Sequence, residues 1–160
     1  MKCKCSLSQD MTLDNVDKQI IELLCDDARL SQRQLAQKVG VAQGTITNRI
    51  RRLEDEGVIE GYSAVLNPES LGWGMTVMAG LCIEKGKIMD VQRHISADHR
   101  VFCVYDVTGD WDSMVLARVK DRQDLDNLTK TVFTVEGVSR SYTHVVLNIV
   151  KESGVRMPEE

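Results

Sequence analysis

The sequence has little proline, few aromatic residues and no long apolar segment. Two prolines and 11 glycines in 160 residues exclude a collagen-like, mucin-like or low-complexity polymer. The longest apolar stretch, from Val145 to Val150, is interrupted by Asn148 and falls far short of the ~20 residues that span a bilayer. We therefore expect no membrane contact. The length suits one domain, or two small ones, with a core that needs no disulfide or metal.

The five cysteines show no repeated C-x-x-C spacing, and no cleavable apolar leader precedes them. This pattern favours a reducing, cytoplasmic location. Cys3 and Cys5 form one C-x-C pair without a partner pair nearby, so we predict no metal site and interpret the first residues as a tail. The sequence also lacks a P-loop and a nucleophile elbow, and His94 and His99 have no supporting ligand pattern. We predict neither a cofactor nor an enzymatic activity.

Helical periodicity marks three short segments in the first third of the chain. Apolar residues recur at spacings of three and four from Leu13 to Leu24, which predicts a first helix. Ser31 and Gln34 have the spacing of a capping box, and the second helix that they begin should end at Gly40 in the left-handed conformation. A third helix is predicted over 43–56. Two helices joined by a tight turn and covered by another form the helix-turn-helix pattern.

The pattern changes after Gly57. An extended stretch followed by a segment with proline and glycines predicts a linker over 63–74. From 75 to 152, strand-like and helix-like segments alternate in the order β-α-β-β-α-β, the order of a ferredoxin-like sandwich. We therefore predict an α+β protein with a winged-helix-like helix-turn-helix domain over 12–62 and a ferredoxin-like domain over 75–152. The predicted strands cover 75–84, 101–108, 113–119 and 138–150.

Charge is distributed unevenly along an acidic chain, in which 20 lysines and arginines oppose 24 acids. Residues 10–27 hold six acids and one base, whereas residues 28–53 hold six bases and no acid. A local positive field over the two predicted helices suits a surface that approaches phosphates. The alternative is an ordinary solvated helix face. The six bases are Arg29, Arg33, Lys38, Arg49, Arg51 and Arg52.

The third predicted helix has one apolar and one polar face. At 100° per residue, Ile50 and Leu53 both fall within about 40° of Ile46. The opposite side carries asparagine and arginine, which pair bidentately with adenine and guanine edges in a major groove, and a glycine that lets the backbone come close. Arg49 lies near the edge of the apolar face. The predicted DNA-contacting residues are Gln43, Gly44, Thr45, Thr47, Asn48, Arg51 and Arg52.

Two sets of motifs together resemble one family. Over residues 12–152 the sequence resembles the Lrp/AsnC (leucine-responsive regulator/asparagine regulator) family of prokaryotic transcription factors. It departs from that family at Ala42, where members often carry a serine that caps the recognition helix. The motifs are the run from Leu13 to Leu24, Leu35-Ala36, Val39-Gly40-Val41, the run from Arg49 to Tyr62, and the turn Gly109-Asp110-Trp111-Asp112.

The resemblance implies a DNA-binding regulator whose assembly and operator binding respond to a small molecule, usually an amino acid. It implies a homodimer built through the C-terminal sheets, often assembled into tetramers or octamers, on double-stranded DNA. Asp carboxylates can receive an α-ammonium group, and backbone N–H groups of a glycine turn can receive an α-carboxylate. A plain hairpin is the alternative for this turn. By motif match the effector-binding residues are Gly109, Asp110, Asp112, His144 and Val145.

Two other functions are alternatives. Siroheme decarboxylases resemble this sequence in having the same two-domain architecture. However, residues 60–64 differ from the basic segment of those enzymes, and residues 102–106 lack their Tyr-Arg pair. A sensor without DNA contact is the other alternative, and the intact basic helix pair argues against it. For the decarboxylase, the candidate tetrapyrrole-contacting residues are His94, His99, His144, Arg100 and Arg140.

Overall fold

The computed structural model describes residues 12–158, and the chain forms two compact units. One unit comprises the described residues up to Ala64 together with those from Ser153 onward, and the other runs from Val65 to Glu152. Cys3 and Cys5, considered above as a metal-binding pair, lie outside the described residues.

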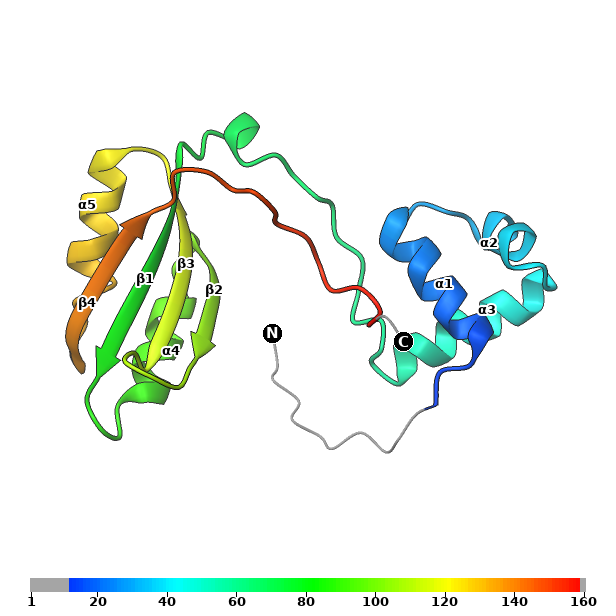
Figure 1. Cartoon of the computed structure of the whole chain (residues 1–160), viewed down its shortest axis with the longest axis horizontal. Coiled ribbons are helices and arrows are strands. Elements are labelled where there is room, and N and C mark those ends of the chain that lie inside the picture. The colour runs from blue at the N-terminus through cyan, green and yellow to red at the C-terminus, as the bar shows by residue number, and fades with distance from the viewer. Residues whose placement is uncertain (1–11, 159–160) are drawn as a thin grey trace. The chain divides into compact units, whose positions relative to one another are not determined.

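Three helices form the first unit: α1 (Asn15–Asp26), α2 (Gln32–Val39) and α3 (Gln43–Asp55) (Figure 1). Their apolar faces meet in one small core, where Ile20, Ile46 and Leu53 are fully buried. This is the helix-turn-helix arrangement that the apolar spacing predicted.

Local signals fix the ends of these helices. The Ser31 side chain accepts a hydrogen bond from the Gln34 N–H and the Gln34 side chain accepts one from the Ser31 N–H, so the predicted capping box is present. Gly40 ends α2 with φ 79°, in the left-handed region. In contrast, Ala42 precedes α3 without a side-chain cap. A turn over 56–57 and a bend over 58–59 follow α3, and residues 60–67 have no regular secondary structure and pair with no strand of the described residues.

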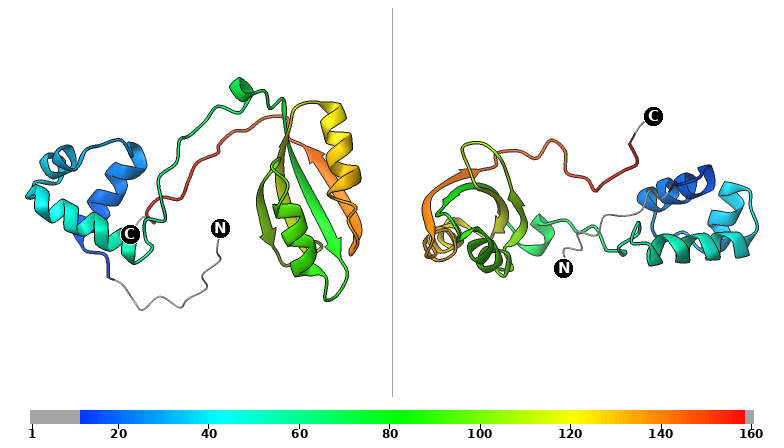
Figure 2. Two further views of the ribbon diagram at one scale, coloured as in Figure 1. Left: turned by 180° about the vertical axis from the view of Figure 1, so that it is seen from behind. Right: turned by 90° about the horizontal axis from the view of Figure 1, so that it is seen from below.

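The second unit is one antiparallel sheet in the order β2-β3-β1-β4, covered on one face by two helices (Figure 2). This confirms the predicted ferredoxin-like order. Alternate residues of the strands, such as Val77 and Val115, fill the core under the helices. Phe133, which follows α5, is buried in the same core. The elements are β1 (Met75–Ile83), α4 (Ile88–Ser96), β2 (Val101–Asp106), β3 (Ser113–Val119), α5 (Arg122–Thr131) and β4 (Val138–Val145), preceded by a short 3-10 helix over Glu69–Leu71.

Two strands end at least two residues earlier than predicted, and the first ends one residue earlier, at Ile83. The last strand stops at Val145, not at residue 150, because its neighbour β1 begins at Met75 and the last ladder bond runs from the Val146 N–H to the Thr76 carbonyl. Beyond that point the apolar residues have no strand beside them. The second strand likewise stops at Asp106, not at residue 108. None of the helices in residues 12–158 is long and apolar enough to cross a membrane.

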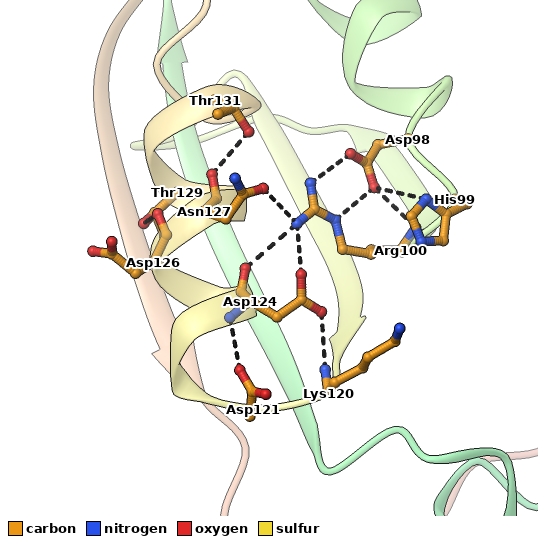
Figure 3. A network of polar contacts seen from close by, with 10 residues as sticks. All are labelled: Asp98, His99, Arg100, Lys120, Asp121, Asp124, Asp126, Asn127, Thr129 and Thr131. Atoms are coloured by element: carbon orange, nitrogen blue, oxygen red, sulfur yellow. Dashed lines mark hydrogen bonds and ion pairs between the residues drawn. The ribbon is translucent and has the colours of Figure 1, made fainter.

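A buried guanidinium fastens the start of β2 to α5 (Figure 3). The Arg100 side chain is 8% exposed and donates two hydrogen bonds to the Asp98 carboxylate, at 2.9 and 2.7 Å. It donates further bonds to the side chains of Asp124 (2.8 Å) and Asn127 (2.9 Å) on α5. The bonds from Arg100 lower the pKa of Asp98 from its ordinary value of 3.8 to about 2 and raise that of Arg100. The ion pair therefore belongs to the fold of this unit.

Candidate DNA-reading helix and effector turn

The face of α3 that points away from the core is polar and exposed. Gln43, Gly44, Asn48 and Arg51 are exposed, and Thr45 is partly exposed. The helical wheel thus placed Gly44, Asn48 and Arg51 on the exposed side of the helix, opposite the buried apolar residues.

One of the predicted DNA contacts joins the two helices of the motif. The Thr47 hydroxyl lies 2.6 Å from the Gln32 side-chain oxygen on α2 and 3.1 Å from the Gln43 carbonyl. A hydroxyl has one proton to donate, so these two acceptors compete for it. The contact holds the first turn of α3 against the start of α2, and it fixes the angle at which α3 leaves the turn.

Two arginines of α3 are paired with acids at the start of α1. The Arg49 guanidinium contacts the carboxylates of Asp14 and Asp17, the latter at 3.1 Å, and Arg52 contacts Asp17. Asp17 is fully buried, whereas the Arg49 and Arg52 side chains are 28% and 40% exposed. The N–H of Asp17 and then Arg49 lower the pKa of Asp14, and hydrogen bonds to both acids raise that of Arg49. The acids thus neutralise two of the six bases.

The other four bases have no such partner. Among the described residues, no ion pair involves the side chains of Arg29, Arg33, Lys38 and Arg51. Arg51 is the one of these that lies on α3. The positive charge predicted over residues 28–53 therefore comes from these four unpaired side chains. On the exposed face of α3 it comes from Arg51.

The turn between β2 and β3 is pinned to β1. The Asp112 N–H donates to the Leu81 carbonyl (2.9 Å), and the Asp112 carboxylate accepts a hydrogen bond from the Ile83 N–H (2.7 Å). Gly109 has φ 116°, which a side chain would strain. One Asp112 oxygen is thus engaged within the fold, while Asp110 is exposed with its carboxylate unbonded in the described residues. Of the two acids predicted to bind an ammonium group, Asp110 is therefore the one whose carboxylate has no hydrogen bond to the described residues.

Trp111 lies across a glycine of β1, on the face of the sheet that no helix covers. A Cβ atom at Gly80 would come 2.6 Å from the Trp111 ring, so only glycine fits there. Tyr142 lies beside Trp111 with ring centroids 5.3 Å apart, and the Arg140 guanidinium sits 5.3 and 4.9 Å from the two rings. Tyr142 is half exposed, so this aromatic cluster opens to the surface.

The predicted effector residues are separated within one protomer. The turn packs against Leu81 and Ile83, whose partners on β4 are Ser141 and Val138, whereas His144 and Val145 pair with Met78 and Val77. Along β1, Leu81 is three residues or about 10 Å from Met78, and Ile83 is five residues or about 17 Å from Met78. The five predicted residues therefore occupy two places on the sheet. Gly109, Asp110 and Asp112 form one place, and His144 and Val145 form the other.

The residues of the tetrapyrrole alternative are not gathered into a site. Arg100 is enclosed by its carboxylate and amide partners, and Arg140 stacks on two aromatic rings. His94 and His99 are exposed, the latter with its ring centroid 6.1 Å from that of Trp73. Within residues 12–158, no three His, Cys, Asp or Glu side chains cluster in a way that could hold a metal ion.

Sequence reasoning missed the acids of α1 as partners of α3. In the sequence, Asp14 and Asp17 are acids at the start of a predicted helix, a place where negative charge is favoured without any partner. The available signal was the acid-rich first helix next to a base-rich third one, but a wheel of a single helix carries no information on what packs against it.

Comparisons with known proteins agree with both units. Residues 13–60 match a family model described as winged helix-turn-helix DNA-binding, and residues 76–156 match one described as Lrp/AsnC ligand binding domain. An uncharacterized HTH-type transcriptional regulator of Pyrococcus furiosus is 46% identical over 142 residues, with 89% of this chain and 96% of the relative covered. The regulator FL11 of the same organism is 36% identical, with 88% and 93% covered.

Solved structures show the same two-part fold. A transcriptional regulator of Neisseria meningitidis in complex with L-Met is 26% identical, with a TM-score of 0.83 and with 92% of this chain and 97% of that chain covered. Escherichia coli AsnC, at 21% identity, matches with a TM-score of 0.85 and coverages of 91% and 99%, which supports the fold.

Proposed function

Because the chain belongs to the Lrp/AsnC family of DNA-binding, ligand-modulated transcriptional regulators, we propose that α3 enters the major groove and reads bases with Asn48 and Arg51. The observation that carries this assignment is that these two side chains are exposed on the face opposite the core. Gln43, Gly44 and Thr45, in the first turn, lie where the helix meets phosphates. The Arg52 guanidinium is held by Asp17, so Arg51 is the first cation to reach DNA.

The uncovered face of the sheet supports a homodimer. Met78, Phe102, Tyr105 and Tyr142 are large side chains exposed on the strands, and no helix lies over that side. Two sheets packed face to face would bury them. A two-fold dimer presents two reading helices, so its operator is a rough palindrome. Met78→Asp should shift the mass measured by light scattering towards the monomer, while Met89→Asp, an exposed methionine on α4, should not.

An amino acid is the effector that the second unit suits best. The N. meningitidis regulator was solved with L-Met, and the exposed Asp110 carboxylate next to backbone N–H groups suits an α-ammonium and an α-carboxylate. The protein acts as a regulator in the cytoplasm, where the DNA is, and it is not an enzyme. Assembly into tetramers or octamers would bring further copies of the turn together.

The DNA-reading assignment is tested by selection and by substitution. A randomised duplex library is selected with the wild-type protein, and binding of the recovered duplex is compared between wild type and variants at fixed salt. Arg51→Gln and Asn48→Ala should each cost about 1–3 kcal/mol and relax the preference at one base position. Gln37→Ala, an exposed change on α2, is the control. Failure of the wild type to enrich any sequence would refute DNA reading itself.

The effector assignment is tested on the same duplex with a panel of amino acids, L-Met included. Asp110→Asn should abolish the change in binding that an active amino acid causes in the wild type. Asp106→Asn removes an equal charge from the nearby end of β2 and should retain the response. A wild-type response in Asp110→Asn would rule out this carboxylate as an ammonium receptor.

A further inference from the structure

The acids at the start of α1 occupy guanidinium groups of the reading helix. Asp14 and Asp17 form a reciprocal cap, in which each carboxylate accepts a hydrogen bond from the other's N–H, at 3.0 and 3.2 Å. This cap fixes both carboxylates, and Arg49 and Arg52 of α3 then contact them. Two negative and two positive charges are thus held together by a rigid helix end.

A carboxylate and a phosphate bind a guanidinium in the same way, through its fork of N–H donors. A DNA phosphate that approaches Arg52 competes with Asp17, which already contacts one guanidinium nitrogen of Arg52. If Arg52 moved to the phosphate, the fully buried Asp17 would keep one arginine partner, Arg49, instead of two. The Arg52 side chain is 40% exposed, but Asp17 already balances the positive charge that it presents to DNA.

We propose that Asp14 and Asp17 are positioning residues: they withhold Arg49 and Arg52 from the DNA backbone, so that Arg51 is the arginine of α3 that contacts DNA. This inference rests on the proposed reading role of α3 and goes beyond it, because it assigns a function to α1. The quantity that the two acids change is the number of DNA phosphates that the first unit neutralises.

Withholding cations lowers binding to any DNA, because phosphate contacts are independent of sequence. Each phosphate contact adds about 0.9 to the slope of the logarithm of affinity against the logarithm of salt concentration. Base contacts are unaffected by this loss. A unit with two fewer phosphate contacts therefore has weaker non-specific binding and a smaller salt dependence, and its affinity for the operator depends for a larger share on base contacts.

The first test neutralises Asp14, since asparagine is an equally good helix cap and preserves the fold. In Asp14→Asn, one carboxylate faces two guanidinium groups and one positive charge is uncompensated. We expect the salt slope on a mixed-sequence duplex to steepen by up to about 0.9 and the affinity for that duplex to rise. Adding Arg49→Gln to Asp14→Asn should restore the wild-type slope.

The matched control is Glu22→Gln. It removes the same charge from α1 about 12 Å further along the helix, a separation beyond the Debye length of about 8 Å at physiological salt. Any general effect of reduced negative charge appears in this control as well. The proposal requires that Asp14→Asn change the slope more than Glu22→Gln does.

A second comparison keeps the acids and changes the arginines. On a mixed-sequence duplex, where Arg51 has no matching base to read and its charge lies against phosphates, Arg51→Gln should reduce the slope by up to about 0.9, and Arg52→Gln should reduce it by clearly less. Equal reductions would show that Arg52 leaves Asp17 for a phosphate, which overturns the proposal while leaving DNA reading intact. An unchanged slope in Asp14→Asn, or a steeper one that persists after Arg49→Gln, overturns it as well. If the wild type binds no duplex, the proposed function fails first.

Discussion

Removing the charge of Asp98 should make the stability of the second unit less dependent on pH. The folded pKa of this carboxyl is about 2 against an ordinary value of 3.8, chiefly because Arg100 donates two hydrogen bonds to the ionised form. A depressed pKa contributes stability that is present above the ordinary pKa and is lost as the pH falls through the folded one. A shift of this size corresponds to about 2 kcal/mol, lost between about pH 4 and pH 2.

The assay uses the two tryptophans as local reporters. Trp73 and Trp111 both lie in the unit from Val65 to Glu152, so denaturant unfolding followed by tryptophan fluorescence reports this unit. At neutral pH, Asp98→Asn should lower the free energy of unfolding by about 2–3 kcal/mol, since Arg100 keeps its two partners on α5 but loses its bidentate one. The gap between wild type and variant should shrink by about 2 kcal/mol between pH 4 and pH 2.

Asp126→Asn is the control for the loss of an ion pair as such. Asp126 pairs with Lys130 on the surface of α5, both more than half exposed, and its loss should cost less than about 1 kcal/mol at any pH. If the curves of wild type and Asp98→Asn ran parallel from pH 7 to pH 2, the bidentate contact would not depress the pKa and the reasoning would be refuted.

Three further substitutions test local contacts. Gly80→Ala places a methyl group against the Trp111 ring and should lower stability by about 1–3 kcal/mol with a shift in tryptophan emission, measured by fluorescence-detected unfolding. Ala42→Ser supplies the missing cap of α3 and should stabilise the first unit by about 1 kcal/mol, seen as slower hydrogen exchange of the first amides of α3. Asp112→Ala leaves the Ile83 N–H without its acceptor. It should lower the free energy of unfolding by about 1 kcal/mol in the same fluorescence assay, with no effector present.

The parts of the fold that sequence predicted are those set by neighbours in the chain. The capping box at Ser31 and the left-handed end at Gly40 depend on residues within one helical turn, and apolar spacing fixes which side of α3 is buried. The order of strands and helices follows from alternating periods in the same way. For these features the local preference and the final structure agree, so a single sequence was sufficient.

The parts that sequence did not predict depend on partners far along the chain. Asp14 and Arg49 are 35 positions apart, and only the packing of α1 on α3 brings them together. The final strand stops at Val145 because β1 offers no further partner, although the next residues have strand propensity. A propensity describes one segment, whereas a ladder bond or an ion pair needs two.

The separation of the predicted effector residues links ligand binding to assembly. Asp112 accepts a hydrogen bond from the Ile83 N–H near the end of β1, and His144 pairs with Met78, five residues or about 17 Å away along the strand. An amino acid is too small to contact both places in one protomer, so we expect a ligand that touches both to lie between protomers. Such a ligand would bind an assembly more tightly than a protomer, and by linkage it would shift the equilibrium towards that assembly by its difference in affinity. On this hypothesis the spacing of the reading helices changes with effector concentration, and the DNA-binding unit needs no ligand contact of its own.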